Sequence, residues 1–298
     1  MVQPSSEGGG DLIDGVLVID KPSGVTSHDV VAVARRAIGE RRIGHTGTLD
    51  PLATGVLPLA CGRATRLVRF LTASDKEYQA TVRFGMTTDS YDVTGTETSR
   101  SALRPDRDAV TRALASLTGS YLQTPPAFSA KKVAGRRAYD MARREEAVEL
   151  SPVPVTVTTA ELDAFNGDTA QVRLVCSAGF YVRAFAHALG ELAGPGACLE
   201  ALRRTRSGEF TLDRPTTLEE LSSGVPPVAV VPMERLLTTL PAVVVTAEGR
   251  DRVSHGQEVE GASGTAEWVR LMDGAGRLVA MARPGSQPGL LHPAVVLI

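Results

Sequence analysis

The residues GHTGTLDPLATG (44–55) form the stretch of sequence that identifies the fold. They comprise three glycines, three threonines, one histidine and one carboxylate, Asp50, among their twelve positions. Glycines let the backbone approach a ligand closely, and Pro51 pushes Asp50 into an extended or turn conformation. The stretch therefore predicts an ordered loop that presents a single carboxylate. A helix that begins at Pro51 with Asp50 as its N-cap is the ordinary alternative for an Asp-Pro pair.

On both sides of this loop, short strands and helices follow one another without strict alternation. The expected strands are 15–20, 78–84, 153–165 and 169–176. The expected helices are one that begins near Ser27 or Asp29, then 60–71, 106–117, 137–146 and 181–192. Residues 41–58 are too polar for a core strand, and 123–135 read as a loop. This mixture indicates an α+β domain.

A change of pattern near the C-terminus predicts a second unit. Pro226, Pro227 and Pro232 mark its approach, and short β runs follow Pro241. These runs are AVVVT, WVRLMD, RLVAMARP and AVVLI, separated by glycine-containing turns. They indicate a compact β module of roughly 60 residues, a size that folds beside a partner domain.

The composition excludes several classes of protein. No apolar stretch approaches the roughly 20 residues of a membrane span. The three cysteines, Cys61, Cys176 and Cys198, are an odd and scattered set, which fits a reducing cytoplasm better than a disulfide framework. Neither a zinc-binding motif nor a GxxxxGK[ST] phosphate loop is present. The polar residues 1–10 lack the pattern of a signal peptide, and we expect a disordered start at 1–14.

Net charge does not mark the chain as a nucleic-acid binder, because it is only −2. Phosphate contacts need local basic surface rather than a basic total. Arginines and lysines gather at 35–42, 63–69, 131–137 and 203–206. Solvated helix faces are the alternative explanation for each such cluster.

The motif at 44–66 resembles the catalytic loop of the TruB-type tRNA pseudouridine-55 synthases, and further segments match that family in the same order. They are VLVIDKPSGVTSHDVV (16–31), KEYQATVRFGMTTDSYDVTG (76–95), TPPAFSAKKVAGRRAYDMAR (124–143), CSAGFYVRAFAHALG (176–190) and ALRRTRSGEF (201–210). The chain departs from the family wording at Phe128, Lys131, Ala134 and Ala188. The resemblance implies a pseudouridine-synthase catalytic domain at 15–238, with a mixed β-sheet and flanking helices. It is followed at 239–298 by a small β domain that resembles PUA-type RNA-binding domains.

The resemblance also implies site residues and a reaction. Asp50, Tyr78 and Arg183 match the catalytic aspartate, the base-stacking tyrosine and the carboxylate's partner. The positions expected to contact substrate are Lys21, His45, Lys132, Tyr181 and Leu202. The expected reaction isomerises uridine 55 in the T loop of tRNA, in the cytoplasm, without cofactor, metal, membrane or obligate protein partner. The target base would be flipped out of its stack, with His45 filling the vacated position.

Three routes remain open for the carboxylate: attack on the sugar, attack on the base, or removal of the C2′ proton. All three need an ionised Asp50, which a neighbouring Arg183 stabilises. Two other functions compete with this one. One is a catalytically silent RNA-binding protein, and the other is a hydrolase that pairs Asp50 with Asp89 or Asp92. The β module, which contains Glu248 and Glu267, is either an RNA contact or a structural cap.

Overall fold

The structure is a computed structural model that describes residues 13–128, 132–133, 136–137, 150–223 and 230–298. Its main feature is a mixed sheet of ten strands. The continuous path is β13 (Thr216–Thr217), β1 (Gly15–Lys21), β3 (Thr54–Cys61), β12 (Ala197–Ser207), β4 (Lys76–Phe84), β11 (Thr169–Cys176), β10 (Val153–Phe165) and β7 (Gly119–Gln123). Off this path, β14 (Val230–Pro232) pairs with β1, and β2 (Ile43–His45) pairs with β3.

A short parallel pairing in the middle of the sheet joins the part around β1 and β3 to the antiparallel part formed by β12, β4, β11, β10 and β7. There β12 lies beside β3, with Arg203 opposite Thr54 and Arg204 opposite Gly55. Gly55 has a φ of 100°, and a Cβ at this position would overlap the carbonyl oxygen of Arg204. Only glycine fits this close approach, so the last glycine of the 44–55 motif is needed to bring the two halves of the sheet together.

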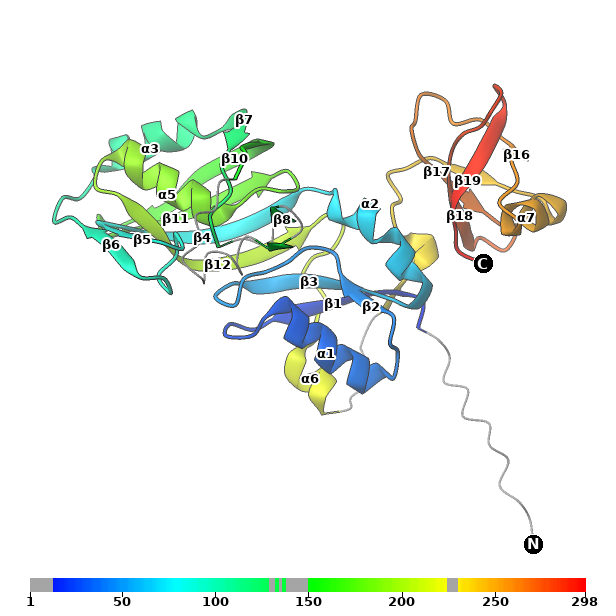
Figure 1. Ribbon diagram of the computed structural model, residues 1–298, viewed down its shortest axis with the longest axis horizontal. Coiled ribbons are helices and arrows are strands. Elements are labelled where there is room, and N and C mark those ends of the chain that lie inside the picture. The colour runs from blue at the N-terminus through cyan, green and yellow to red at the C-terminus, as the bar shows by residue number, and fades with distance from the viewer. Residues whose placement is uncertain (1–12, 129–131, 134–135, 138–149, 224–229) are drawn as a thin grey trace, which may run out of the picture.

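Helices cover the sheet in two groups (Figure 1). The pair α3 (Arg107–Ser116) and α5 (Val182–Ala193) packs over β4, β11 and β10, whereas α1 (Ser27–Ile38) and α6 (Leu218–Ser222) lie beside β1 and β3. A single hydrophobic core unites both groups with the sheet. The expected strands and the helices at 106–117 and 181–192 are confirmed to within about two residues.

Three expectations for the first 75 residues need correction. The N-cap of α1 is Thr26, and Asp29 completes a capping box with it. Residues 54–58, expected to be too polar for a core strand, belong to β3, which is buried along almost its whole length. The expected helix at 60–71 is the end of β3, then a 3₁₀ turn η1 (Gly62–Leu67), then the short α2 (Val68–Thr72). A strand buried on both faces lacks the alternation that identifies a strand in sequence.

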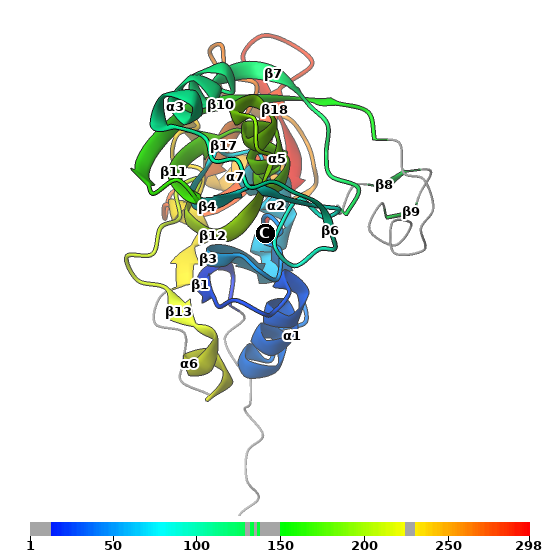
Figure 2. The same cartoon turned by 90° about the vertical axis from the view of Figure 1, so that its left-hand side faces the viewer.

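The remaining short elements lie on the edges of the large unit. One ladder joins β5 (Met86–Thr88) to β6 (Glu97–Arg100), and another joins β8 (Lys132–Val133) to β9 (Arg136–Arg137). Figure 2 shows the β8–β9 ladder standing away from the sheet. The expected helix at 137–146 and the expected disordered start fall almost wholly outside the described residues.

The C-terminal module is a five-stranded sheet with one helix. Its strand order is β15 (Ala242–Val244), β17 (Val269–Met272), β18 (Leu278–Pro284), β19 (Leu290–Val296) and β16 (Val259–Glu260), and its helix is α7 (Ala247–Ser254). A 3₁₀ turn, η2 (Met233–Arg235), precedes it. Leu278, Met281 and Leu297 share one hydrophobic cluster with Val16 and Leu67 of the large unit. The module is therefore attached through a common apolar core, and not only through a linker.

Candidate active site

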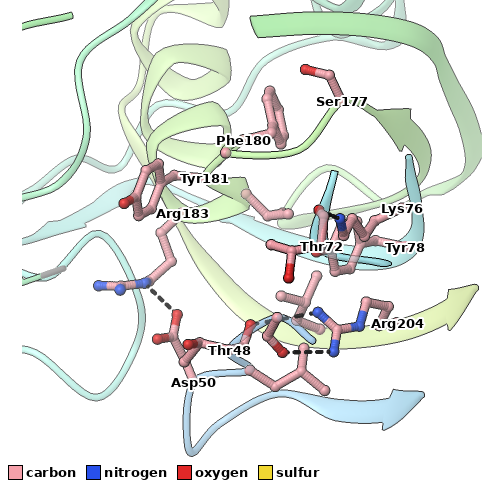
Figure 3. Close-up of a pocket in the computed structure, with 15 residues that line it drawn as sticks. Thr48, Asp50, Thr72, Lys76, Tyr78, Ser177, Phe180, Tyr181, Arg183 and Arg204 are labelled. Carbon is pink, nitrogen blue, oxygen red and sulfur yellow. Dashed lines mark hydrogen bonds and ion pairs between the residues drawn. The ribbon is translucent and has the colours of Figure 1, made fainter. Parts of the chain in front are cut away.

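A cavity of about 350 Å³ opens between the Asp50 loop, β4, α2 and the start of α5 (Figure 3). Residues from four separate segments of the chain line it. They are Gly47, Thr48, Leu49, Asp50, Thr72, Lys76, Tyr78, Ser177, Gly179, Phe180, Tyr181, Val182, Arg183, Leu202 and Arg204. Of the described residues that line it, Asp50 is the single carboxylate.

Asp50 sits at the start of a turn, as the motif predicted, and not at the N-cap of a helix. The amide of Ala53 donates to the carbonyl oxygen of Asp50 at 3.0 Å, and residues 51–52 form the turn. The amide of Gly24 donates to the carbonyl of Pro51 at 2.8 Å and ties the turn to the segment after β1. The Asp50 side chain is 38% exposed, so its carboxylate is accessible from the cavity. The N-cap alternative is therefore wrong.

Arg183 holds that carboxylate from α5. Its Nε donates to Oδ2 of Asp50 at 2.8 Å, and its Nη atoms donate to the carbonyls of Ser90 at 2.9 Å and Phe128 at 2.7 Å. The same Nε lies 3.6 Å from Oδ2 of Asp92. All three nitrogen atoms of the planar guanidinium therefore have a partner, and these bonds keep the guanidinium from turning away from Asp50.

Asp92 is the second carboxylate of this group, and its own bonds commit it to structure. Its Oδ1 accepts hydrogen bonds from the Ser90 hydroxyl at 3.0 Å and from the Thr94 amide at 2.9 Å. Asp89 accepts from the amide of Thr96 at 2.8 Å. Both aspartates line a second hollow of about 480 Å³ on the other side of the Asp50–Arg183 pair. Neither lines the cavity that contains Tyr78.

Tyr78 lies across the cavity from Asp50 on β4, opposite Leu174 of β11 and Arg204 of β12. Its side chain is only 8% exposed. Burial raises the pKa of its phenol above the ordinary value, and the nearby Arg204 guanidinium partly opposes that rise. The phenol is therefore neutral near pH 7 and presents an aromatic face with an intact hydroxyl.

Two buried cations beside Tyr78 are candidates that the sequence analysis did not place in this site, since Arg204 was counted only in the basic cluster at 203–206. Arg204 is 1% exposed, and it donates to the carbonyls of Val56 at 2.7 Å and Gly47 at 3.1 Å. Lys76 donates to the carbonyls of Thr72 and Ser74. Burial first, and then the charge of Arg204, lower the pKa of Lys76 to about 8.

The alternation of strand residues is the signal that would have identified them. In β4, Lys76, Tyr78 and Ala80 share one buried face, and in β12 Leu202 and Arg204 share another. Side chains two residues apart on a strand point the same way. Placing Tyr78 and Leu202 in a site therefore places Lys76 and Arg204 there as well.

The residues expected to contact substrate lie in different parts of the structure. Tyr181 and Leu202 line the cavity, and the Tyr181 backbone is fixed by two hydrogen bonds with Gln123, at 2.8 and 3.1 Å. His45, on β2, is outside the described lining, and burial lowers the pKa of its ring. Its Nδ1 is buried and has no hydrogen-bond partner among the described residues. Lys132 lies in β8, but its side chain is outside the described part of the chain.

Lys21 lies behind the Asp50 loop and is fully buried. Its Nζ donates to the carbonyls of Pro22 at 2.8 Å, Val25 at 2.7 Å and Pro51 at 3.4 Å. Burial lowers its pKa to about 8, and the negative charge of Asp50 works against that shift. This position suits a residue that supports the Asp50 turn from behind.

The described residues contain no group of three or more His, Cys, Asp or Glu side chains placed to hold a metal ion. No helix among them is long and apolar enough to cross a membrane.

Comparison with known proteins gives a consistent result. Residues 35–182 match the TruB family pseudouridylate synthase (N terminal domain). A tRNA pseudouridine synthase B of Solibacter usitatus is 45% identical over 96% of this chain and 100% of its own length. One of Thermobifida fusca is 42% identical over 96% and 99%. Among solved structures, an H/ACA RNP bound to a substrate RNA containing 2′-deoxyuridine is 25% identical, with a TM-score of 0.73 over 95% of this chain and 85% of the other.

Proposed function

The chain belongs to the TruB family of pseudouridylate synthases and is an RNA uridine isomerase, and we propose that it converts uridine 55 of the tRNA T loop to pseudouridine with Asp50 as its catalytic carboxylate. The observation that carries the assignment is the cavity itself. It holds one carboxylate, ion-paired to Arg183, across from one buried aromatic ring, Tyr78. The relatives named above are tRNA pseudouridine synthases, which supports tRNA as the substrate.

The reaction breaks the bond between ribose C1′ and base N1 and forms one between C1′ and C5. The proton on C5 leaves and N1 gains one, so no atom is added or lost and no co-substrate is needed. Asp50 acts by attacking the sugar, by attacking the base, or by taking the C2′ proton, and each route needs its ionised form. Arg183 holds that carboxylate in one orientation, which reduces the entropy lost in reaching the reacting atom.

The detached base is held while it turns. The ring of Tyr78 offers a stacking face, and Leu202 supplies an apolar surface beside it. Stacking fixes the plane of the base and still permits rotation within that plane. Where the base departs with the bonding electrons, the charges of Lys76 and Arg204 stabilise it from the same wall. The neutral hydroxyl of Tyr78 assists removal of the C5 proton by accepting it while it releases its own proton to water, and N1 takes up one proton from water.

The uridine reaches this cavity only after it leaves its stack in the folded T loop, at a cost of a few kcal/mol. His45 is the residue we assign to the vacated position, because its ring is kept neutral by burial and it lies two residues before Gly47 of the cavity wall. Lys132 and Tyr181 are assigned to contacts with the RNA, and Lys21 to support of the Asp50 turn. No second protein is needed in this scheme, and three buried free thiols suit the cytoplasm.

The test is to incubate the protein with an unmodified tRNA transcript and to map pseudouridine by position. We expect product at uridine 55 alone, and none in a matched transcript that carries cytidine there. Pseudouridine at other positions only would contradict the site specificity. Release of free uracil would identify a hydrolase, and tight binding without any product would identify a silent RNA-binding protein.

A further inference from the structure

A tryptophan that contacts two arginines lies where the C-terminal module meets the large unit. The Cζ atom of Arg69, on α2, is 4.7 Å from the ring centre of Trp268, and that of Arg283, on β18, is 4.2 Å from it. Phe70 meets the same indole edge-on, with ring centres 4.7 Å apart. We call Arg69, Trp268 and Arg283 the arginine–tryptophan stack.

Other residues already supply the attachment between the two units. Arg63 and Arg66, in the turn before α2, donate to the carbonyls of Leu297 and Val296. The shared hydrophobic cluster buries Leu278, Met281 and Leu297 beneath them. The Trp268 ring packs against the edge of this cluster. The junction therefore has hydrogen bonds and a core that do not depend on the guanidinium groups of Arg69 and Arg283.

Both guanidinium groups of the stack are exposed and keep their charge uncompensated. In the part of the chain that the structure describes, neither Arg69 nor Arg283 forms a salt bridge. Glu267 precedes Trp268 in the chain but is not paired with either of them. A guanidinium that lies on an indole face is held flat by the cation–π contact, and its N–H groups point outward along its edge. That geometry presents pre-oriented donors to an anion with several acceptor oxygens.

The stack is next to the catalytic cavity. Arg69 is on α2, and Thr72, three residues later at the end of the same helix, lines the cavity. Three residues of helix correspond to about 4.5 Å along its axis. Figure 1 shows α2 placed between the sheet and the C-terminal module. An RNA strand that delivers a nucleotide to Tyr78 therefore has this basic surface beside it.

We propose that the arginine–tryptophan stack binds backbone phosphates of the RNA segment next to the target uridine. The proposal rests on the function proposed above, since it takes the RNA substrate as the partner. Such contacts position the RNA and carry no sequence preference. They also make affinity depend on salt, because each phosphate that is neutralised releases condensed counterions.

The experiment measures the Kd for unmodified tRNA at several salt concentrations. The variants are Arg69→Gln, Arg283→Gln and the double variant. Arg112→Gln is the matched control, because Arg112 is an exposed arginine on α3, at the far end of the large unit. Each stack substitution should weaken binding several-fold and reduce the slope of log K against log salt by about 1, and the double variant by about 2. The control should match the wild type.

Two results would overturn the proposal: unchanged affinity and slope in the double variant, or a fall in Tm with unchanged affinity, which would make the stack a structural clamp only. If the double variant unfolds, Arg283→Gln alone can be compared with the wild type in affinity and salt slope, because this side chain is exposed. Single-turnover pseudouridine formation at protein concentrations below the Kd should fall by the same factor as the affinity in each stack variant. A wild type that makes no pseudouridine would refute the proposed function, whereas an unchanged affinity and salt slope in the double variant would refute only the stack.

Discussion

Two buried arginines reach the loop at 47–50 from opposite sides, and they are held in opposite ways (Figure 3). Arg183 is paired with carboxylates, at 2.8 Å from Asp50 and 3.6 Å from Asp92. Arg204 contacts no carboxylate within the described residues. Its guanidinium donates instead to backbone carbonyls, among them those of Gly47 and Val56.

Arg183 and Arg204 therefore have different roles. Arg183 pairs with two aspartates and fixes the Asp50 carboxylate in space. Arg204 fixes the backbone of the loop and leaves its positive charge uncompensated beside Tyr78 and Lys76. One wall of the cavity thus carries an arginine shared between two carboxylates, and the opposite wall is cationic. Electrostatic stabilisation is strongest where fixed charges face the place where charge develops.

Apart from a change of Asp50 itself, Arg183→Met should have the largest effect of the changes on the two walls. Methionine cannot hold the Asp50 carboxylate in place. It also leaves the buried carboxylate of Asp92, 7% exposed, without a paired positive charge. We expect single-turnover rates to fall by a factor on the order of 10⁴ and the free energy of unfolding to fall by about 3 kcal/mol.

Arg173→Met is the matched control for stability. Arg173 pairs with Glu161 at 2.7 Å, but the pair lies on the surface, with side chains 35% and 59% exposed. Its loss should cost less than about 1 kcal/mol in urea unfolding. Equal losses in the two variants would show that burial of the Arg183 group contributes nothing.

Tyr78→Phe should have the next largest effect on the rate. Phenylalanine keeps the ring, so most of the roughly 1–3 kcal/mol of base stacking remains. Deletion of the hydroxyl removes its part in proton transfer, and the rate should fall by about 10²–10⁴. Tyr78→Leu should lose both rate and affinity. The measurements are tRNA affinity and single-turnover rate, with circular dichroism as the folding check. A phenylalanine variant as fast as the wild type would make Tyr78 a stacking platform alone.

Arg204→Lys should have a smaller effect than either. Lysine keeps the charge but cannot reproduce the fork that binds Val56 and Gly47. The loop then shifts, and a displacement of about 1 Å costs on the order of 10² in rate. If Arg204→Met and Arg204→Lys lose the same activity, the fork is what matters. If lysine restores full activity, charge alone matters and the bracing role assigned to Arg204 is wrong.

Lys76→Met should produce the smallest change, visible in the pH dependence of stability. Because burial lowers the pKa of Lys76 from 10.5 to about 8, the unfolded chain binds this proton more tightly than the folded one. The folded state is therefore penalised below pH 8, and the penalty is relieved as pH rises toward 10.5. Between pH 7 and 9.5, wild-type stability should rise by on the order of 2 kcal/mol relative to the variant. The measurement is urea unfolding of the wild type and the variant at both pH values. An equal change in the free energy of unfolding of the two proteins between pH 7 and 9.5 would contradict this prediction.

The sequence predicted which residues line this cavity better than it predicted the framework around them. Asp50 followed from the composition of its loop, and Tyr78 and Arg183 from the resemblance, since the hydrogen bond between Asp50 and Arg183 spans 133 residues of chain. Arg204 and Lys76 were missed although strand alternation places them beside Tyr78 and Leu202.

The framework was harder to read where tertiary contacts decide it. Because β3 is buried on both faces, its sequence lacks the alternation typical of a strand. The reason for its Gly55 is visible only in the fold, where the Arg204 backbone approaches too closely for a Cβ atom. Lys21 was expected to touch substrate, and only the folded chain shows its ammonium surrounded by three carbonyls.

The central claim is that Asp50 is the reacting carboxylate, and Asp50→Asn tests it most directly. Asparagine keeps the size of the side chain, and its amide oxygen can still accept from Arg183, so the fold should survive. The measurement is the single-turnover rate of pseudouridine formation at uridine 55, with folding verified by circular dichroism. We predict no detectable turnover by the folded variant. A folded variant that forms pseudouridine at a rate near that of the wild type would contradict the account.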